Sequence, residues 1–212
     1  MTNNLRFASA ETGSDFATFV QRANHLGCQH IRLVVRGELL LASVAVLERE
    51  GLLDAHPDVI GMRIYELTAE QDQFDTVVEV RAVLDRLARS ATEFVLPLAQ
   101  PGIAWAGTTP PQSGWEPRGV VAEATLERIA REGIDQVAQA NALGAKIVTE
   151  VRRQTWGGQE LAVGEAPSFA RGAAFAAFGL GFLGESEGVA TVSTAGAWMR
   201  LSTQRGHVLV RG

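Results

Sequence analysis

The chain has 212 residues, of which 46% are hydrophobic and 20% charged, a composition that is typical of a folded globular protein and excludes wholesale disorder. The single cysteine, Cys28, excludes an internal disulfide and favours a reducing compartment. The net charge of −5 argues against nucleic-acid binding, because phosphate contacts need a basic surface.

The sequence also argues against a membrane protein. Residues 1–6 contain no apolar stretch of the kind that a secretion signal needs. The longest apolar run, residues 173–183, is too short for a spanning helix, which takes about 20 residues. We therefore expect no membrane contact and a cytoplasmic location.

A helix followed by a hairpin is predicted near the N-terminus. Apolar residues recur at spacings of three and four between residues 16 and 26, which is typical of an amphipathic helix. Ser14 is the expected N-cap and Gly27 the expected C-terminal stop. Gly37 allows a tight turn. The strands expected around and after that turn comprise residues 31–35, 39–47 and 59–67.

The pattern repeats in the middle of the chain. Residues 77–89 have helical spacing, and residues 94–98 and 103–106 resemble strands joined by a turn at Gly102. Residues 107–114 then lack periodicity and are rich in turn-forming types. We predict a boundary there, with one α+β subdomain over residues 1–112 and a second over residues 113–212.

The second half begins with a predicted helix over residues 120–141, which Gly133 is expected to break or kink. Residues 147–155 resemble a strand, and Ser168 is the expected cap of a helix over residues 169–182. The strands expected at the C-terminus comprise residues 189–194, 198–203 and 207–211.

Three segments share the order helix, strand, turn glycine, strand, with the turns at Gly37, Gly102 and Gly196. A strand-like run precedes each helix. Because strands and helices do not alternate regularly, a parallel doubly wound sheet is disfavoured. The predicted fold class is therefore α+β, with antiparallel β-hairpins packed against helices in repeated β-α-β-β-like units.

Two short motifs do not predict a cofactor or a metal. Residues 179–184 match G-x-G-x-x-G but lack the preceding strand and the following helix of a dinucleotide site. Two carboxylates, Glu185 and Glu187, follow where a phosphate would bind. We therefore expect residues 179–184 to form the C-terminus of a helix. His25, Cys28 and His30 have ligand-like spacing without an evident fourth ligand. Serine-nucleophile and zinc-protease motifs are absent, which disfavours an enzyme without excluding one.

The C-terminal hairpin is the strongest candidate for a ligand site. Strand alternation places four side chains on one face, those of Trp198, Arg200, Ser202 and Gln204. After a turn at Arg205, His207 begins the return strand and is expected to lie across from Thr203 or Gln204. These side chains could bind an anion. Trp115 and Arg118, in the irregular segment after Trp105, complete the set of candidate residues. For the hairpin, the alternative interpretation is a solvated sheet face with Trp198 packed at its edge. For Trp105 and Trp115, the alternative is that both indoles only anchor a linker to the body of the protein.

Segments 105–107, 110–115 and 200–211 resemble uncharacterised hypothetical proteins of actinobacteria. The resemblance extends over most of the chain and implies a cytoplasmic bacterial protein. It brings no activity and no catalytic residue with it.

Three hypotheses about function follow. The first is a non-enzymatic interaction or scaffold module, a homo-oligomer or the partner of another protein, in which the small-residue helix over residues 169–182 buries a partner. The second is a protein or enzyme that binds a small anionic ligand, which requires Arg200, Arg205 and His207 to converge near Trp115. The third is a sliding-clamp-like architecture, because clamps also repeat helix and hairpin units; it needs a basic inner surface.

Overall fold

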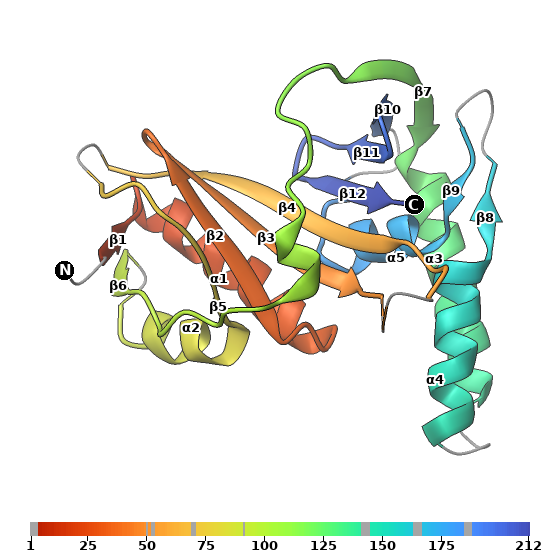
Figure 1. The fold of residues 1–212 in the computed structure, drawn as a ribbon, viewed down its shortest axis with the longest axis horizontal. Helices are drawn as coiled ribbons and strands as arrows, with labels where there is room; N and C mark the ends of the chain where they lie inside the picture. The colour runs from red at the N-terminus through yellow and green to blue at the C-terminus, as the bar shows by residue number, and fades with distance from the viewer. Residues whose placement is uncertain are drawn as a thin grey trace. The chain divides into compact units, whose positions relative to one another are not determined.

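The computed structural model describes residues 4–49, 51, 54–68, 71–90, 92–140, 145–162, 167–184 and 188–212. The chain divides into two compact units. The first unit consists of Met1–Ala45 and Met62–Thr109, and the second consists of Val46–Gly61 and Pro110–Gly212. Strands β3 (Leu39–Leu47) and β4 (Asp58–Glu66) each contribute residues to both units (Figure 1). The fold is α+β with antiparallel strands, as the sequence predicts; the division at residue 112 stays a prediction.

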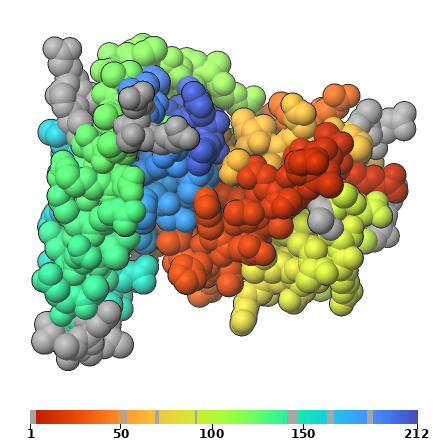
Figure 2. All heavy atoms as spheres, turned by 180° about the vertical axis from the view of Figure 1, so that it is seen from behind, coloured from red at the N-terminus to blue at the C-terminus, as the bar shows by residue number. Residues whose placement is uncertain are grey.

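The first unit is a sheet with helices on one face. Its strand order is β5-β2-β3-β4, where β5 covers Asp75–Glu79 and β2 covers His30–Arg36. Helices α1 (Ala10–His25) and α2 (Val80–Leu87) pack against each other and lie on the surface shown in Figure 2, in orange-red and yellow. The remaining elements are β1 (Asn4–Arg6), which pairs with β6 (Glu93–Val95), and a 3₁₀ turn, η1 (Ala104–Gly107).

The core of the first unit follows the alternation that the sequence shows. Ile31, Leu33 and Val35 on β2 are buried, whereas the residues between them are partly exposed. Phe16 of α1 completes this core by stacking on Phe94 with ring centroids 5.9 Å apart. Helix and sheet therefore share one apolar interior, which is the main stabilising term for such a unit.

Three local predictions for the first unit are wrong. The N-cap of α1 is Ser9 rather than Ser14, since the Ser9 hydroxyl accepts a hydrogen bond from the Thr12 amide at 3.2 Å. Residues 77–79 belong to β5, because they pair with β2, and α2 starts only at Val80. Residues 103–106 form no strand; η1 occupies most of that segment. Gly27 does end α1, with φ 87°.

The second unit is a sheet whose strand order is β4-β12-β11-β10-β7. The new strands are β7 (Glu116–Ala122), β10 (Val189–Ala195), β11 (Trp198–Ser202) and β12 (His207–Arg211). Helices α3 (Glu123–Gln139) and α5 (Gly172–Gly179) pack on each other, and α5 also contacts β12. A short hairpin, β8 (Glu160–Leu161) with β9 (Phe169–Ala170), lies near them.

Residues 147–155 are helical, so the strand predicted there is wrong. They belong to α4 (Ala145–Arg153) and to a π-helical turn, η3 (Gln154–Gly158). The β-branched residues of this segment favour a strand, but α4 packs against α3, and such tertiary contacts override local propensity. The turn η3 then places Trp156 in the core, where it is 1% exposed.

The helix predicted over residues 120–141 is shorter than expected. Residues 120–122 belong to β7, because they pair with β10. Helix α3 continues through Gly133, so the break that was predicted there as one of two possibilities is absent. The expected last residue, 141, lies outside the described residues.

The helix predicted over residues 169–182 also begins later, at Gly172, because Phe169 and Ala170 form β9. Ser168 does not cap it; its hydroxyl donates to the Glu160 carboxylate at 2.6 Å. Helix α5 ends at Gly179, and Gly181 follows with φ 73°, so the glycine string marks a helix C-terminus, as predicted. Glu185 and Glu187 lie outside the described residues.

Two of the three expected repeat units appear in the structure. The order β1-α1-β2-β3 turns at Gly37, and the order β9-α5-β10-β11 turns at Gly196; these glycines have φ 60° and 57°. In the second of these units the strand before the helix is β9, at residues 169–170 that were predicted as helix. Gly102 does not join two strands, since η1 follows it. Among the described residues, no helix is both long enough and apolar enough to cross a bilayer.

Candidate functional site

The predicted site residues of the C-terminal hairpin lie on β11 and β12 of the second unit. Trp198, Arg200 and Ser202 alternate along β11 on one face of the sheet. In the antiparallel register, Ser202 faces His207 and Arg200 faces Leu209 across to β12. The sheet therefore holds Arg200, Ser202 and His207 side by side, and their backbones are fixed by strand pairing.

Trp115 joins this group from the segment before β7. Its indole lies under the Arg200 guanidinium, whose central carbon is 4.3 Å from the ring centroid. The indole N–H donates to the Pro111 carbonyl at 2.9 Å, which fixes the ring. A guanidinium over an indole face is a favourable cation–π arrangement.

Arg200 has no other partner among the described residues. Its Nε is buried and makes no hydrogen bond. Burial also lowers the pKa of Arg200, although an arginine stays protonated in any case. The site thus contains a positive charge that the stacked tryptophan supports and that is not paired with a carboxylate.

His207 and Ser202 form the polar edge of this cluster. The Nδ1 atom of His207 lies 3.0 Å from the Ser202 hydroxyl. Burial of the imidazole, and then the charge of Arg200, lower the pKa of His207 below its ordinary value of 6.5. At neutral pH the ring is therefore mainly uncharged, so it offers hydrogen bonds rather than a second positive charge.

The other predicted site residues lie elsewhere. Arg205 points to the Leu183 carbonyl, with its Nη1 at 3.4 Å. Arg118 pairs with Glu116 and donates to the Thr194 hydroxyl at 2.8 Å. Trp198 is buried beneath Arg211, whose guanidinium lies 6.0 Å from the ring centroid. Strand alternation could predict the partners on β11, but not the directions that these longer side chains take.

A separate cavity of about 540 Å³ lies in the second unit near the β10–β11 turn. Trp198, Met199 and Phe169 give it apolar walls, while His56 and the Ser168–Glu160 pair supply polar groups. The serine hydroxyl donates to the carboxylate, so it is not activated as a nucleophile by a histidine. Neither His56 nor Glu160 stands in a recognisable motif, so the sequence did not indicate them as site residues.

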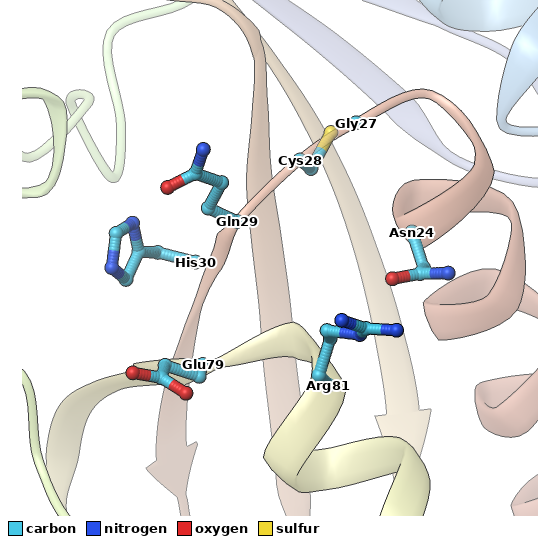
Figure 3. Close-up of a pocket in the computed structure, with 7 residues that line it drawn as sticks. All are labelled: Asn24, Gly27, Cys28, Gln29, His30, Glu79 and Arg81. Atoms are coloured by element: carbon cyan, nitrogen blue, oxygen red, sulfur yellow. The ribbon is translucent and has the colours of Figure 1, made fainter.

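The first unit has a smaller cavity of about 370 Å³. Figure 3 shows that its side chains come from the end of α1, the start of β2 and the junction of β5 with α2. Cys28 and His30 line it, but His25 does not. Within the described residues, no three histidine, cysteine or carboxylate side chains are grouped as a metal site would require.

The fold resembles that of the DNA polymerase sliding clamps. The DNA polymerase III subunit beta from Pseudomonas aeruginosa matches with a TM-score of 0.51 and 15% identity over 100% of this chain. A putative DNA polymerase III beta subunit from Eubacterium rectale matches over 99% of this chain, with a TM-score of 0.57 and 10% identity. A Helicobacter pylori beta clamp matches over 100% of this chain, with a TM-score of 0.52 and 10% identity. The chain spans only 63–64% of the length of these proteins, and at such identities the likeness shows the fold alone.

By sequence, the chain belongs to the family described as Domain of unknown function (DUF8010), whose model matches residues 1–107. Residues 110–212 match a second model, Domain of unknown function (DUF8185). A search of curated protein sequences found no match.

Proposed function

We propose that this protein is a non-enzymatic interaction module with a sliding-clamp-like fold, and that it associates with a second copy of itself through the open edge of β7. The clamp-like fold supports an interaction role, because its neighbours are subunits of a larger machine, DNA polymerase III. The edge of β7 supplies the surface on which the proposal rests.

In the second unit, β7 is the terminal strand of the sheet. Val120 on this strand is 61% exposed, and Val189 on the neighbouring β10 is 58% exposed. Because Val120 faces Thr191 in the register, Val189 lies diagonally next to Val120 on the same face. An edge strand with exposed valines presents both backbone donors and apolar surface to another strand.

A second copy satisfies this edge without a further component. Two β7 strands that pair antiparallel about a two-fold axis bring identical surfaces together, as the common symmetric dimers do. The helix over residues 169–182, which motivated the interaction hypothesis, does not supply this surface. Residues 172–177 of α5 are buried inside the second unit, so a partner cannot reach them.

The charges of α3 support interaction with protein rather than with nucleic acid. This helix contains four carboxylates and two guanidiniums. Arg128 pairs with Glu132 and Arg131 pairs with Glu127, both one helical turn apart. Arginines that are neutralised within their own helix leave little positive charge for phosphate contacts.

Light scattering during size-exclusion chromatography tests the proposal over a range of protein concentrations. We expect a mass of twice the 22.7 kDa chain mass for the unmodified protein. The substitution Val120→Lys should give the single-chain mass, because a lysine on an edge strand opposes pairing. A matched control is Val95→Lys, at an exposed valine of the first unit, which should leave the dimer intact.

A single-chain mass at every concentration would overturn the proposal, as would a dimer that survives Val120→Lys. The actinobacterial origin and the cytoplasmic location stay predictions from the sequence.

A further inference from the structure

Beyond the proposed function, we propose that the face of the second unit formed by Trp115, Arg200, Ser202 and His207 binds a carboxylate group through the terminal nitrogens of Arg200. The inference does not depend on self-association, since it rests on a different set of side chains.

The guanidinium of Arg200 is unsatisfied within the described part of the chain. Arg200 has no hydrogen bond and no ion pair among the described residues, and its Nε is the atom that is buried without a partner. Trp115 covers a face of the guanidinium, but hydrogen-bond donors lie in the guanidinium plane. The terminal Nη groups therefore keep their donors for a ligand, while the tryptophan restricts the side chain in advance.

Of the four side chains that form this face, only that of Arg200 carries a charge near neutral pH. Arg118 is paired with Glu116, and Arg205 is turned to the Leu183 carbonyl. His207 adds no charge near neutral pH, because burial and Arg200 lower its pKa. A single guanidinium matches a monoanion, and the two oxygens of a carboxylate fit two parallel N–H donors.

A hydrogen-bonding pair lies beside the charge. The Ser202 hydroxyl and His207 Nδ1 lie 3.0 Å apart, and both residues stay partly exposed. The hydroxyl and the imidazole can donate and accept, so they can bind the polar group that carries the carboxylate. A phosphate dianion carries two negative charges, and Arg200 would neutralise only one of them.

The experiment follows the imidazole of His207 by NMR while a probe anion is added. Three probes are used: sodium acetate, a capped Ala-Glu-Ala tripeptide and inorganic phosphate, with a capped Ala-Gln-Ala tripeptide as the uncharged control. A carboxylate bound to Arg200 offsets its positive charge, so the pKa of His207 should rise with acetate or with the glutamate peptide. A response to acetate would show that a free carboxylate is sufficient for binding. A response to the glutamate peptide alone would show that the carboxylate comes from a protein side chain.

Variants separate specific binding from general electrostatics. Arg200→Gln should weaken carboxylate binding about tenfold or more, because charge-assisted hydrogen bonds are lost. Arg205→Gln is the matched control from the same hairpin and should bind as the unmodified protein does. Arg200→Lys keeps the charge but loses the planar fork, and should bind with intermediate strength.

Three results would overturn the proposal. The first is an unchanged pKa of His207 with both carboxylate probes, and the second is an equal response in Arg200→Gln. The third is tighter binding of phosphate than of either carboxylate. None of these results bears on the mass of the protein in solution, so failure here is distinguishable from failure of the β7 dimer.

Discussion

The indole of Trp156 lies directly against Gly133 of α3, in the space that a side chain at residue 133 would occupy. Trp156 also stacks on Phe175 of α5, with ring centroids 4.4 Å apart and an interplanar angle of 16°. The glycine thus serves packing rather than helix bending. This contact joins η3, α3 and α5 into the core of the second unit.

Replacing Gly133 by alanine should destabilise the protein, although alanine is the better helix former. Alanine gains about 1 kcal/mol in helix propensity. The added methyl group overlaps the ring of a tryptophan that is 1% exposed, and overpacking costs about 1–3 kcal/mol. We expect a net loss in the free energy of unfolding, measured by urea denaturation.

The reverse substitution Ala124→Gly, at an exposed position of the same helix, should cost about 1 kcal/mol through propensity alone. In the background Trp156→Leu, Gly133→Ala should become neutral or stabilising, because the clash is removed. A Gly133→Ala protein more stable than the unmodified one would show that the ring moves aside freely.

The contact between Gly133 and Trp156 illustrates what sequence periodicity could not predict. The pattern of α3 was clear, but the reason for its glycine lies in a residue 23 positions along the chain. Segment 147–155 was mistaken for a strand because its β-branched residues favour that state, while its helical contacts with α3 are tertiary. Strands that pair locally, such as β2 with β3, were predicted well because alternation and the turn at Gly37 define them.

The same limit applies to the candidate site. Alternation along β11 predicted that Arg200 and Ser202 share a face. The sequence placed His207 across the turn from Thr203 or Gln204, whereas the register of the structure sets it opposite Ser202. The contact of Arg200 with Trp115 depends on a segment far from the hairpin in sequence. The direction of Arg205 depends on the Leu183 carbonyl, which no local pattern indicates.

A buried carboxylate holds the start of α3 to the segment after α5. Glu123 is 5% exposed, and its side chain accepts a hydrogen bond from the Gly184 amide, while Gly188 packs against the carboxylate group. Glu123→Ala leaves the Gly184 amide without this acceptor, so the free energy of unfolding should fall by about 1–3 kcal/mol.

Glu123→Gln keeps an acceptor oxygen and should cost less than Glu123→Ala in the same urea denaturation experiment. The control is Glu127→Ala, which removes an exposed ion pair with Arg131 and should cost about 0.5 kcal/mol or less. Equal losses in Glu123→Ala and Glu127→Ala would contradict a special role for the buried carboxylate.

In the first unit, the pair of Arg32 and Asp75 should make stability depend on acid pH. The guanidinium donates two hydrogen bonds, from Nε at 2.8 Å and from Nη2 at 2.6 Å. These bonds lower the pKa of Asp75 below its ordinary value of 3.8. The unfolded state therefore binds more protons between the two pKa values, and the contribution to stability is present above pH 3.8 and lost as the pH falls through the folded pKa.

Asp75→Asn should thus lower the free energy of unfolding at pH 7, and the difference from the unmodified protein should shrink as the pH falls below 3.8. Because the Asp75 side chain is 46% exposed, solvent screening limits the effect to about 1 kcal/mol. Urea denaturation at pH 7, 4 and 2 measures it. A difference that stays constant over this range would mean that the ion pair is not its cause.

The pKa of His207 should lie below 6.5 and should respond to Arg200. Burial of the imidazole is the larger cause and the charge of Arg200 the smaller, so Arg200→Gln should raise this pKa while leaving it below 6.5. Between the folded pKa and the unfolded value near 6.5, the unfolded state binds the extra proton. The free energy of unfolding should therefore fall as the pH is lowered through 6.5 and level off below the folded pKa. Imidazole NMR gives the pKa directly, and denaturation of His207→Gln between pH 8 and pH 5 should lack this component of the pH dependence. A measured pKa at or above 6.5 would show that the ring is solvated and that Arg200 does not act on it.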